Sequence, residues 1–390
     1  MVDALKRIWF ISVREWKRMV SRPLYVFCMI IAPIFCYVFF TTLMGEGLPN
    51  NMPVGVVDMD NTSTSRSIVR NLDAFQMTDI IAQYSNFDDA RKAMQQGKIY
   101  AFYYIPSHTT EKALASRQPR VSFYTNNAFM IPGSLLWKEM RTMSELASGS
   151  VGRATLRAKG YTDKQAVAFL QPIAIDAHAL NNPWLNYSVY LSNTILPGIL
   201  MLLIFQMTIY SVGVEQKDDT VKKWFGYADN NIIIALTGKL LPQTFIFFMV
   251  TSLYDAYLYG FLNYPCNGGI LPMMLASLLL VLASQAFGLF LYGALPSIRF
   301  AMSVASLWGV LSFSLSGFTF PCMAMHPTLQ GLAYLFPLRH YFLIYVNQAL
   351  NGYSMIYAWQ SYLMLLVFLA LPFFIIKRLK MELMNYKYMP

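Results

Sequence analysis

Six apolar stretches, each of more than 20 residues, constrain the fold of this 390-residue chain more than any other feature. A helix needs about 20 apolar residues to cross the roughly 30 Å of hydrocarbon in a bilayer. Charged residues make up 13% of the chain, whereas soluble domains carry about 25%, and this deficit excludes a purely soluble protein. The sequence therefore predicts a polytopic α-helical membrane protein with spans over residues 24–44, 187–214, 240–262, 269–295, 300–320 and 353–376.

Residues 1–23, ahead of the first span, have the pattern of a basic amphipathic helix that lies along lipid headgroups. Its apolar residues gather on one side: Leu5, Ile8, Trp9, Trp16, Met19 and Val20. A cleaved signal peptide is the other interpretation of a basic segment before an apolar run. Signal cores are only about 7 to 15 residues long, so we expect residues 24–44 to be retained as the first span.

Lys and Arg are distributed unevenly about the spans, and this distribution predicts their orientation. With the N-terminus in the cytoplasm, the inner segments hold 15 of the 30 basic residues, whereas the short outer loops hold only Arg339. Basic residues in short flanks resist translocation. We therefore expect both termini in the cytoplasm, including a basic tail over residues 377–390. The formal net charge of +10 reflects these membrane edges and gives no support for a nucleic-acid partner.

Residues 45–186 break the apolar pattern with the composition of a folded domain, which the orientation places outside the cytoplasm. Alternation of strand and helix patterns predicts a small α/β sheet, with strands near residues 53–60, 79–84, 99–105 and 120–124 and helices near 62–75 and 87–96. Helical spacing returns over residues 132–169. This helix either stands on the membrane or packs within the domain. Asp58 and Asp60, at a strand end, suit a turn better than a divalent ion.

The residues reveal no catalytic constellation and no metal centre. His108 and His178 are isolated, and no G-x-x-x-x-G-K-[ST] motif occurs, so nucleotide hydrolysis has no site in this sequence. The four cysteines fit no zinc pattern. We therefore expect a transport protein without a cofactor of its own, not an enzyme. Cys266 and Cys322 both fall on the outer side, where they either form a disulfide or remain separate thiols.

Asp255 lies well inside the third predicted span, where an unpaired acid is costly. Tyr254 and Tyr257 beside it offer hydroxyl groups or aromatic faces. Three interpretations remain open from the residues alone. Asp255 lines or gates a transport pathway, it serves as a structural hydrogen-bonding partner, or it is exposed at the outer boundary, with the tyrosines marking the aromatic belt.

The inner segment between the second and third spans, residues 215–239, is the most polar connection inside the cytoplasm. A short helix there would present Glu215, Lys217, Asp218 and Asp219 to another protein. Plain anchoring at the membrane surface by Trp and Lys is the alternative.

The order of these parts resembles the ABC-2 type permeases of ATP-binding-cassette transporters, in the branch with a large extracytoplasmic domain after the first span. Four features carry the resemblance: VGVVDMDNTSTSRSIV at the start of the inserted domain, the inner segment with Glu215, Thr220 and GKLLP at 238–242, SGFTFPCMAMHPTLQGLAYLFPLRHY at 316–341, and the basic tail. Together they cover nearly the whole chain. The family has Gly before the Thr of the inner segment, and this chain departs from it with Asp219.

The resemblance implies that the inner segment contacts a cytoplasmic ABC ATPase subunit, which holds ATP and Mg, and that two permease subunits form a homodimer or heterodimer. It carries over Glu215, Thr220 and Lys239 as coupling residues, and the rest of the segment adds charged neighbours. The candidate coupling residues are Glu215, Lys217, Asp218, Asp219, Thr220, Lys222, Lys223 and Lys239.

Residues 321–350 hold an apolar stretch that Pro321, Pro327 and Pro337 interrupt, so it is too short to cross the bilayer twice. The resemblance implies a pair of short re-entrant helices on the outer side. Arg339 and His340 are pathway candidates near its exit, and headgroup anchoring is the alternative for Arg339.

The sequence therefore predicts the permease subunit of an exporter in a bacterial inner membrane, which moves an amphiphilic or hydrophobic small molecule. Its outer domain either shapes release or docks a periplasmic membrane-fusion adaptor. The expectation of an adaptor rests on family analogy alone. A secondary transporter driven by an ion gradient is one alternative, and it predicts dependence on Asp255. A membrane-anchored adhesive or sensory surface protein is the other, and it predicts no associated ATPase.

Overall fold

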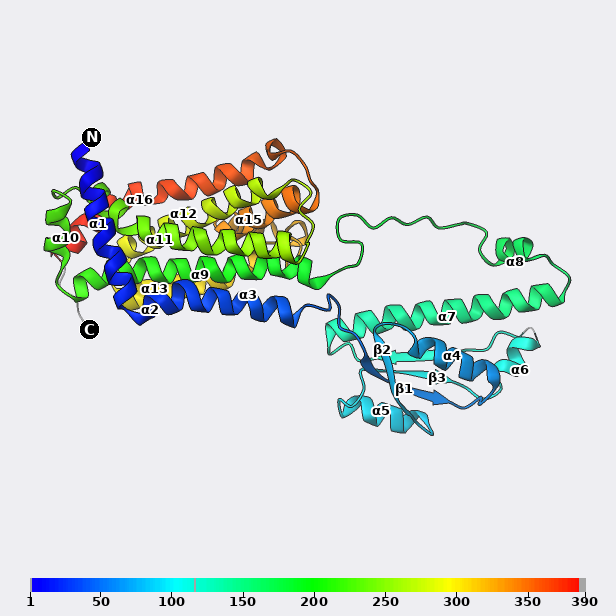
Figure 1. Ribbon diagram of the computed structural model, residues 1–390. Helices are drawn as coiled ribbons and strands as arrows, with labels where there is room; N and C mark the ends of the chain where they lie inside the picture. The colour runs from blue at the N-terminus through cyan, green and yellow to red at the C-terminus, as the bar shows by residue number, and fades with distance from the viewer. Residues whose placement is uncertain (1, 116, 386–390) are drawn as a thin grey trace. The chain divides into compact units, whose positions relative to one another are not determined.

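The computed structural model describes residues 2–115 and 117–385, and the chain divides into two compact units (Figure 1). The membrane unit contains the described parts of residues 1–45 and 180–390, and the inserted unit contains those of 46–179. The predicted basic tail extends to residue 390, so its last five residues lie outside the described part.

Six helical segments among the described residues are long and apolar enough to cross a membrane, as the sequence predicts: Pro23–Leu43, Tyr187–Lys217, Ile232–Phe261, Ile270–Ala294, Ile298–Leu315 and Met355–Asn385. The first contains α2 (Pro23–Val26), a π-helical turn η1 (Phe27–Ile31) and α3 (Ala32–Leu43). The others are built from α9 (Tyr187–Lys217), α11 (Ile232–Asp255) with the π-helical turn η2 (Ala256–Phe261), α12 (Ile270–Ala294), α13 (Ile298–Leu315), and η5 (Met355–Ala358) with α16 (Trp359–Asn385).

Helix α11 begins earlier than the sequence predicts, and α16 ends later. Asn231 caps α11, because its side-chain oxygen accepts a hydrogen bond from the Ile233 amide at 3.0 Å. The predicted inner loop over residues 215–239 is therefore wrong at both ends, where α9 and α11 are helical, and a short helix α10 (Val221–Tyr227) lies between them. The tail from residue 377 to 385 continues α16 as helix and is no separate segment.

Helix α12 lies at the centre of the membrane unit, where it packs against α9, α11, α15 (Pro337–Tyr345) and α16. Figure 1 shows these helices side by side, with α1 (Val2–Ser21) crossing their ends near α10. Large buried side chains such as Phe205, Phe287 and Tyr341 fill the spaces between them. The two short helices expected within residues 321–350 are α14 (Pro327–Ala333) and α15, flanked by η3 (Cys322–Ala324) and η4 (Val346–Leu350).

The inserted unit is a four-stranded sheet with helices on both faces. Its strands are β1 (Met52–Asp58), β2 (Thr78–Gln83), β3 (Ala101–Ile105) and β4 (Ser122–Thr125) in the order β2-β1-β3-β4, with β4 antiparallel to β3 and the other pairs parallel. Its helices are α4 (Ser63–Asp73), α5 (Phe87–Gln95), α6 (Thr109–Leu114), α7 (Met130–Ala158) and α8 (Asp163–Leu170).

Helix α7 packs against the sheet with α4, since Leu136, Met140 and Met143 are buried against the β1 and β3 side chains. This supports packing within the domain over a helix that stands on the membrane. The predicted helix over 132–169 is divided in two, because the chain after α7 turns at Gly160, which has a positive φ of 91°, before α8. Asp58 stabilises the turn after β1, where its carboxylate accepts from the Asp60 amide and the Ser65 hydroxyl.

Candidate functional site

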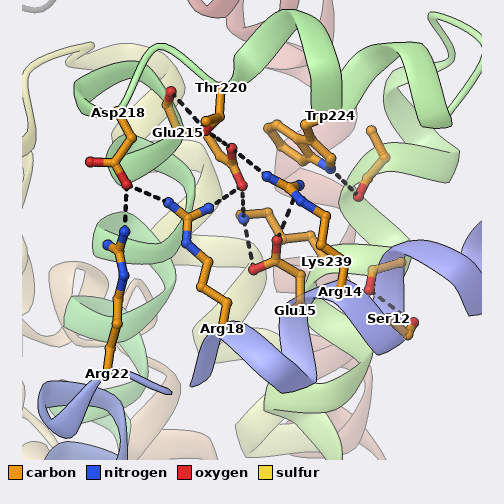
Figure 2. A network of polar contacts seen from close by, with 12 residues as sticks. Ser12, Arg14, Glu15, Arg18, Arg22, Glu215, Asp218, Thr220, Trp224 and Lys239 are labelled. Carbon is orange, nitrogen blue, oxygen red and sulfur yellow. Dashed lines mark hydrogen bonds and ion pairs between the residues drawn. The ribbon is translucent and has the colours of Figure 1, made fainter. Parts of the chain in front are cut away.

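A buried ionic network connects α1, the end of α9 and the start of α11 (Figure 2). Helix α1 turns Ile11, Ser12, Glu15 and Met19 towards the bundle, and all four are buried. Most of the predicted apolar side is exposed, with Trp9 70% exposed, and Met19 is its one fully buried residue. The packing side of α1 is therefore a different face, and it carries the acid Glu15.

The contact between α1 and α11 is close because Gly238 has no side chain. A Cβ at Gly238 would lie only 2.8 Å from Ile11 Cβ. The Ser12 hydroxyl donates a hydrogen bond to the Gly238 carbonyl at 2.9 Å. This fit positions Lys239, the next residue of α11, beside Glu15 of α1.

Lys239 is fully buried between two carboxylates. Its Nζ lies 2.8 Å from Glu215 Oε1 and 2.9 Å from Glu15 Oε2. The ammonium group also lies 4.9 Å from the ring centroid of Trp224, in cation–π contact. Trp224 belongs to α10 and donates to the Ala235 carbonyl at 3.3 Å, so the network also holds the connecting helix.

Glu215 lies in the last turn of α9, where its carboxylate contacts several cationic side chains. Arg14 Nη2 lies 3.0 Å from Oε2, and Arg18 Nη1 and the Thr220 hydroxyl donate to the same carboxylate. Cations are favoured at this position because the carbonyl groups at a helix C-terminus carry partial negative charge. Burying an isolated carboxylate is very costly, and these contacts compensate for that cost.

Arg18 joins two acids, because its second nitrogen Nη2 lies 2.8 Å from Asp218 Oδ2. Arg22 Nη2 approaches the same oxygen at 2.5 Å. Partial burial of Asp218 opposes its ionisation, but the hydrogen bond and charge of Arg22, together with the charge of Arg18, outweigh burial and lower its pKa. The ion pairs with Asp218 therefore hold the end of α1 against the chain just after α9 at every pH at which Asp218 is ionised.

The chain leaves α9 through a left-handed residue at Asp219, with φ of 52°. The Thr220 amide donates to the Glu215 carbonyl and the Asp219 amide to the Gln216 carbonyl, the two bonds of a Schellman motif. Gly is the usual residue at this position of the motif, and Asp219 adopts the left-handed conformation that Gly favours there. The turn directs the Thr220 hydroxyl back to Glu215.

The predicted coupling residues differ in burial: some are buried, Thr220 is half-buried and the others are exposed. Glu215 and Lys239 are fully buried, so the expectation that Glu215 is presented to another protein is wrong for this side chain. The charged residues on the exposed surface are Lys217, Asp218, Asp219, Lys222 and Lys223. The sequence analysis missed Glu15, Arg14, Arg18 and Trp224 as parts of one network with Glu215.

A family model described as ABC-2 family transporter protein matches residues 23–376, which is most of the chain. The chain belongs to the ABC-2 transporter family. It is therefore a multi-pass permease of an ABC transporter, a class whose members associate with ABC ATPase subunits. A search of curated proteins found no match.

In this ABC-2 permease Asp255 is buried between α11 and α12, where it accepts a hydrogen bond from the Ser277 hydroxyl at 3.0 Å. Exposure at the outer boundary is therefore excluded. Tyr254 stacks on Tyr37 at 4.1 Å between ring centroids and donates to the Ser192 carbonyl. Tyr257, half-buried, lies 3.4 Å from the Thr41 hydroxyl. These contacts support the interpretation of Asp255 as a structural partner.

Arg339 and His340 of the permease are both buried in α15, which does not fit headgroup anchoring. The Arg339 guanidinium lies 5.1 Å from the Tyr334 ring centroid, and His340 Nε2 donates to the Tyr334 carbonyl at 2.9 Å. The two residues thereby fix the junction between α14 and α15.

Of the two alternatives for Cys266 and Cys322, the structure supports separate thiols, because both cysteines are free. Cys266 packs with the central core of the permease, whereas Cys322 packs in a small cluster with Leu315, Ala333 and Phe336. The two thiols therefore belong to different packing environments.

Proposed function

We propose that this chain is the membrane-spanning subunit of an ATP-driven exporter in a bacterial inner membrane, with both termini in the cytoplasm. It works as a homodimer or with a similar subunit, and a separate cytoplasmic ATPase subunit binds ATP and Mg and performs the hydrolysis. The observation that supports this proposal most directly is the buried network of Glu215, Lys239 and Arg18, which joins three helices at one end of the bundle.

The arrangement of these contacts suits the transmission of movement from an ATPase subunit to the membrane helices. The exposed residues Lys217, Lys222 and Lys223 form the surface that an ATPase subunit contacts. Behind it, Trp224 and Lys239 connect α10 to α11, and Glu215 connects α9 to α1. Because separating buried charges from their partners is costly, movement of α10 shifts α1, α9 and α11 together. The path between the two subunits of the dimer then changes shape.

The cargo we propose is an amphiphilic or hydrophobic small molecule. Among the pathway candidates, the half-buried Tyr257 offers an aromatic face, while Tyr254, Asp255, Arg339 and His340 are buried and hold the helices around it. The inserted unit lies outside the cytoplasm in this scheme, where it shapes release or docks a periplasmic adaptor. Its role as an adaptor platform rests on the family resemblance.

Co-purification and hydrolysis test this proposal. The chain is purified together with a co-expressed ABC ATPase subunit from the same cells, and ATP hydrolysis is measured in nanodiscs. Lys222→Glu with Lys223→Glu reverses the exposed charge and should abolish association, while Lys98→Glu with Lys112→Glu, a matched pair of exposed lysines in the inserted unit, should leave association intact.

Glu215→Gln is the variant that separates contact from transmission. Its side chain is buried, so the ATPase should still bind, but stimulation of hydrolysis by the permease should fall at least tenfold. A chain that isolates alone and stimulates no hydrolysis would contradict the proposal and favour an anchored surface protein.

A further inference from the structure

An apolar groove of about 570 Å³ opens along the side of the membrane unit between α11 and α16. Its lining includes Leu240, Phe245 and Phe248 from α11, Leu282 from α12, and Leu369 and Pro372 from α16. Helix α12 packs against both neighbours, and its residues Gln285, Ala286 and Leu289 are buried in the floor of the groove. The volume is that of a site for one small molecule.

Gln285 is an unusual residue in this lining. Its side chain is 97% buried, its Oε1 accepts from the Thr244 hydroxyl at 2.7 Å, and its Nε2 has no partner among the described residues. Gln206 and Gln243 also have one unpaired amide atom among the described residues, since their nitrogens donate but their oxygens lack a partner, and neither residue lines the groove. Buried amide groups are normally paired, so Gln285 lacks a partner that a ligand in the groove would supply.

The orientation of the amide does not alter this conclusion. The single hydrogen of the Thr244 hydroxyl has a second acceptor within reach, the Leu240 carbonyl at 3.0 Å, so this hydroxyl is also able to accept from the Gln285 amide. If the Gln285 amide is rotated so that nitrogen donates to Thr244, its oxygen becomes the unpaired group. One polar end of the amide therefore remains without a protein partner in either orientation.

The depth of Gln285 limits which molecules can pair with it. It lies 15 residues after the first residue of α12 and 9 before the last. At about 1.5 Å per residue these separations are about 22 Å and 14 Å, so the amide lies within the hydrocarbon region. The ester groups of ordinary phospholipids lie at the boundary, and their acyl chains have no polar atom at this depth.

We infer that the groove binds an amphiphile that has a hydroxyl group along its apolar chain, with the hydroxyl paired to the Gln285 amide. A hydroxyl both donates and accepts, so it satisfies either orientation of the amide. The polar head of the ligand stays at the membrane surface, and its chain packs on Leu240, Phe248 and Leu282. This is a binding site in its own right, and it does not require that the ligand be transported.

Matched fatty acids provide the test. At about 1.3 Å per carbon of an extended chain, the hydroxyl of 12-hydroxyoctadecanoate lies about 14 Å below its carboxylate, which is the depth of Gln285. Binding of radiolabelled 12-hydroxyoctadecanoate and octadecanoate is measured on the full-length protein in nanodiscs of phosphatidylethanolamine and phosphatidylglycerol, with empty nanodiscs subtracted. The hydroxylated acid should bind about tenfold more tightly.

Three variants locate the preference. Gln285→Leu should remove it and also raise the melting temperature of the unliganded protein, because an unpaired polar group is lost. Gln206→Leu removes a half-paired amide that lies outside the groove and should keep the preference. Leu282→Trp fills the groove and should block both acids. Equal affinities in the unmodified protein, or a preference that survives Gln285→Leu, would overturn the inference, and neither result depends on an ATPase.

Discussion

Lys239 and Glu215 form a fully buried ion pair between α11 and α9, with Nζ 2.8 Å from Oε1. Glu15 provides a second carboxylate to the same ammonium group from α1. Lys239 therefore joins α1 to α9 and α11, and the position of α1 depends on a residue more than 200 positions away. Charges in such a network stabilise each other only while every partner is present.

Removal of the central cation should be costly. Lys239→Met leaves Glu15 and Glu215 buried without their shared ammonium group, and we expect a loss of about 3–5 kcal/mol in the free energy of unfolding. Thermal denaturation of the purified protein measures the effect. Lys217→Met, at an exposed site of the same region, is the control and should change stability by less than about 0.5 kcal/mol. Adding Glu15→Gln to Lys239→Met should recover part of the loss, and an unchanged melting temperature would show that the pair is dispensable.

The turn after α9 should prefer Gly at position 219. Asp219 has a φ of 52°, a conformation that L-residues adopt at a cost of about 1–2 kcal/mol. Asp219→Gly should therefore stabilise the protein by up to about 1 kcal/mol, whereas Asp219→Val should destabilise it by a similar amount or more. Chemical denaturation of the two variants measures the difference. A Val variant as stable as the Gly variant would be incompatible with this backbone.

Asp255 should be replaceable by Asn without loss of energy coupling. Asn retains an oxygen that accepts from Ser277, so the packing between α11 and α12 is preserved. In vesicles that contain the permease and its ATPase, we expect Asp255→Asn to keep ATP hydrolysis within about twofold of the unmodified complex, and a protonophore to have no effect. A large loss in Asp255→Asn, together with dependence on an ion gradient, would favour a secondary transporter.

Glu139 should weaken the inserted unit at neutral pH. Burial raises its pKa, while a hydrogen bond from the Met77 amide and the charge of Lys138 oppose the shift only in part. A carboxyl group with a raised pKa in the folded protein favours folding when protonated, so stability is lost as the pH rises from the unfolded pKa through the folded one.

Glu139→Gln should consequently slow hydrogen exchange at the β1 and β3 amides at pH 7, with the difference vanishing near pH 4. Glu145→Gln changes a solvent-exposed acid on the same helix and serves as the control. Slower exchange in both variants would point to a general charge effect and contradict the assignment to Glu139.

The six spans could be predicted because the bilayer requires a minimum length and an apolar composition, and both can be recognised in each segment of the sequence by itself. The limits of α11 could not, because the cap at Asn231 follows a short polar run that is equally typical of a loop. The α/β pattern of the inserted unit was predictable from local alternation, since β1, α4, β2 and α5 are each short and bounded by turn residues. The break after α7 was not, because helical spacing continues on both sides of Gly160.

The ionic network was beyond prediction from sequence spacing. Glu15 lies among basic residues on a helix whose apolar stripe faces elsewhere, and only the packing of Ile11 on Gly238 brings it to Lys239. One signal was available: Ile11, Glu15 and Met19 recur at intervals of four, which places an acid in the middle of a second, mixed face. The choice between a disulfide and two separate thiols at Cys266 and Cys322 could not be made from sequence for a related reason, because residues on the same side of a membrane need not lie close together.

The double contact of Arg18 restricts how this protein can diverge among species. One guanidinium serves both Glu215 and Asp218, so although Glu215 keeps Lys239 and Asp218 keeps Arg22, a homologue that loses Arg18 weakens the pairing of two acids at once. Positions 18, 215 and 218 should therefore co-vary as a triplet in descendants of a common ancestor, with intermediates that retain only two of the three rarely preserved.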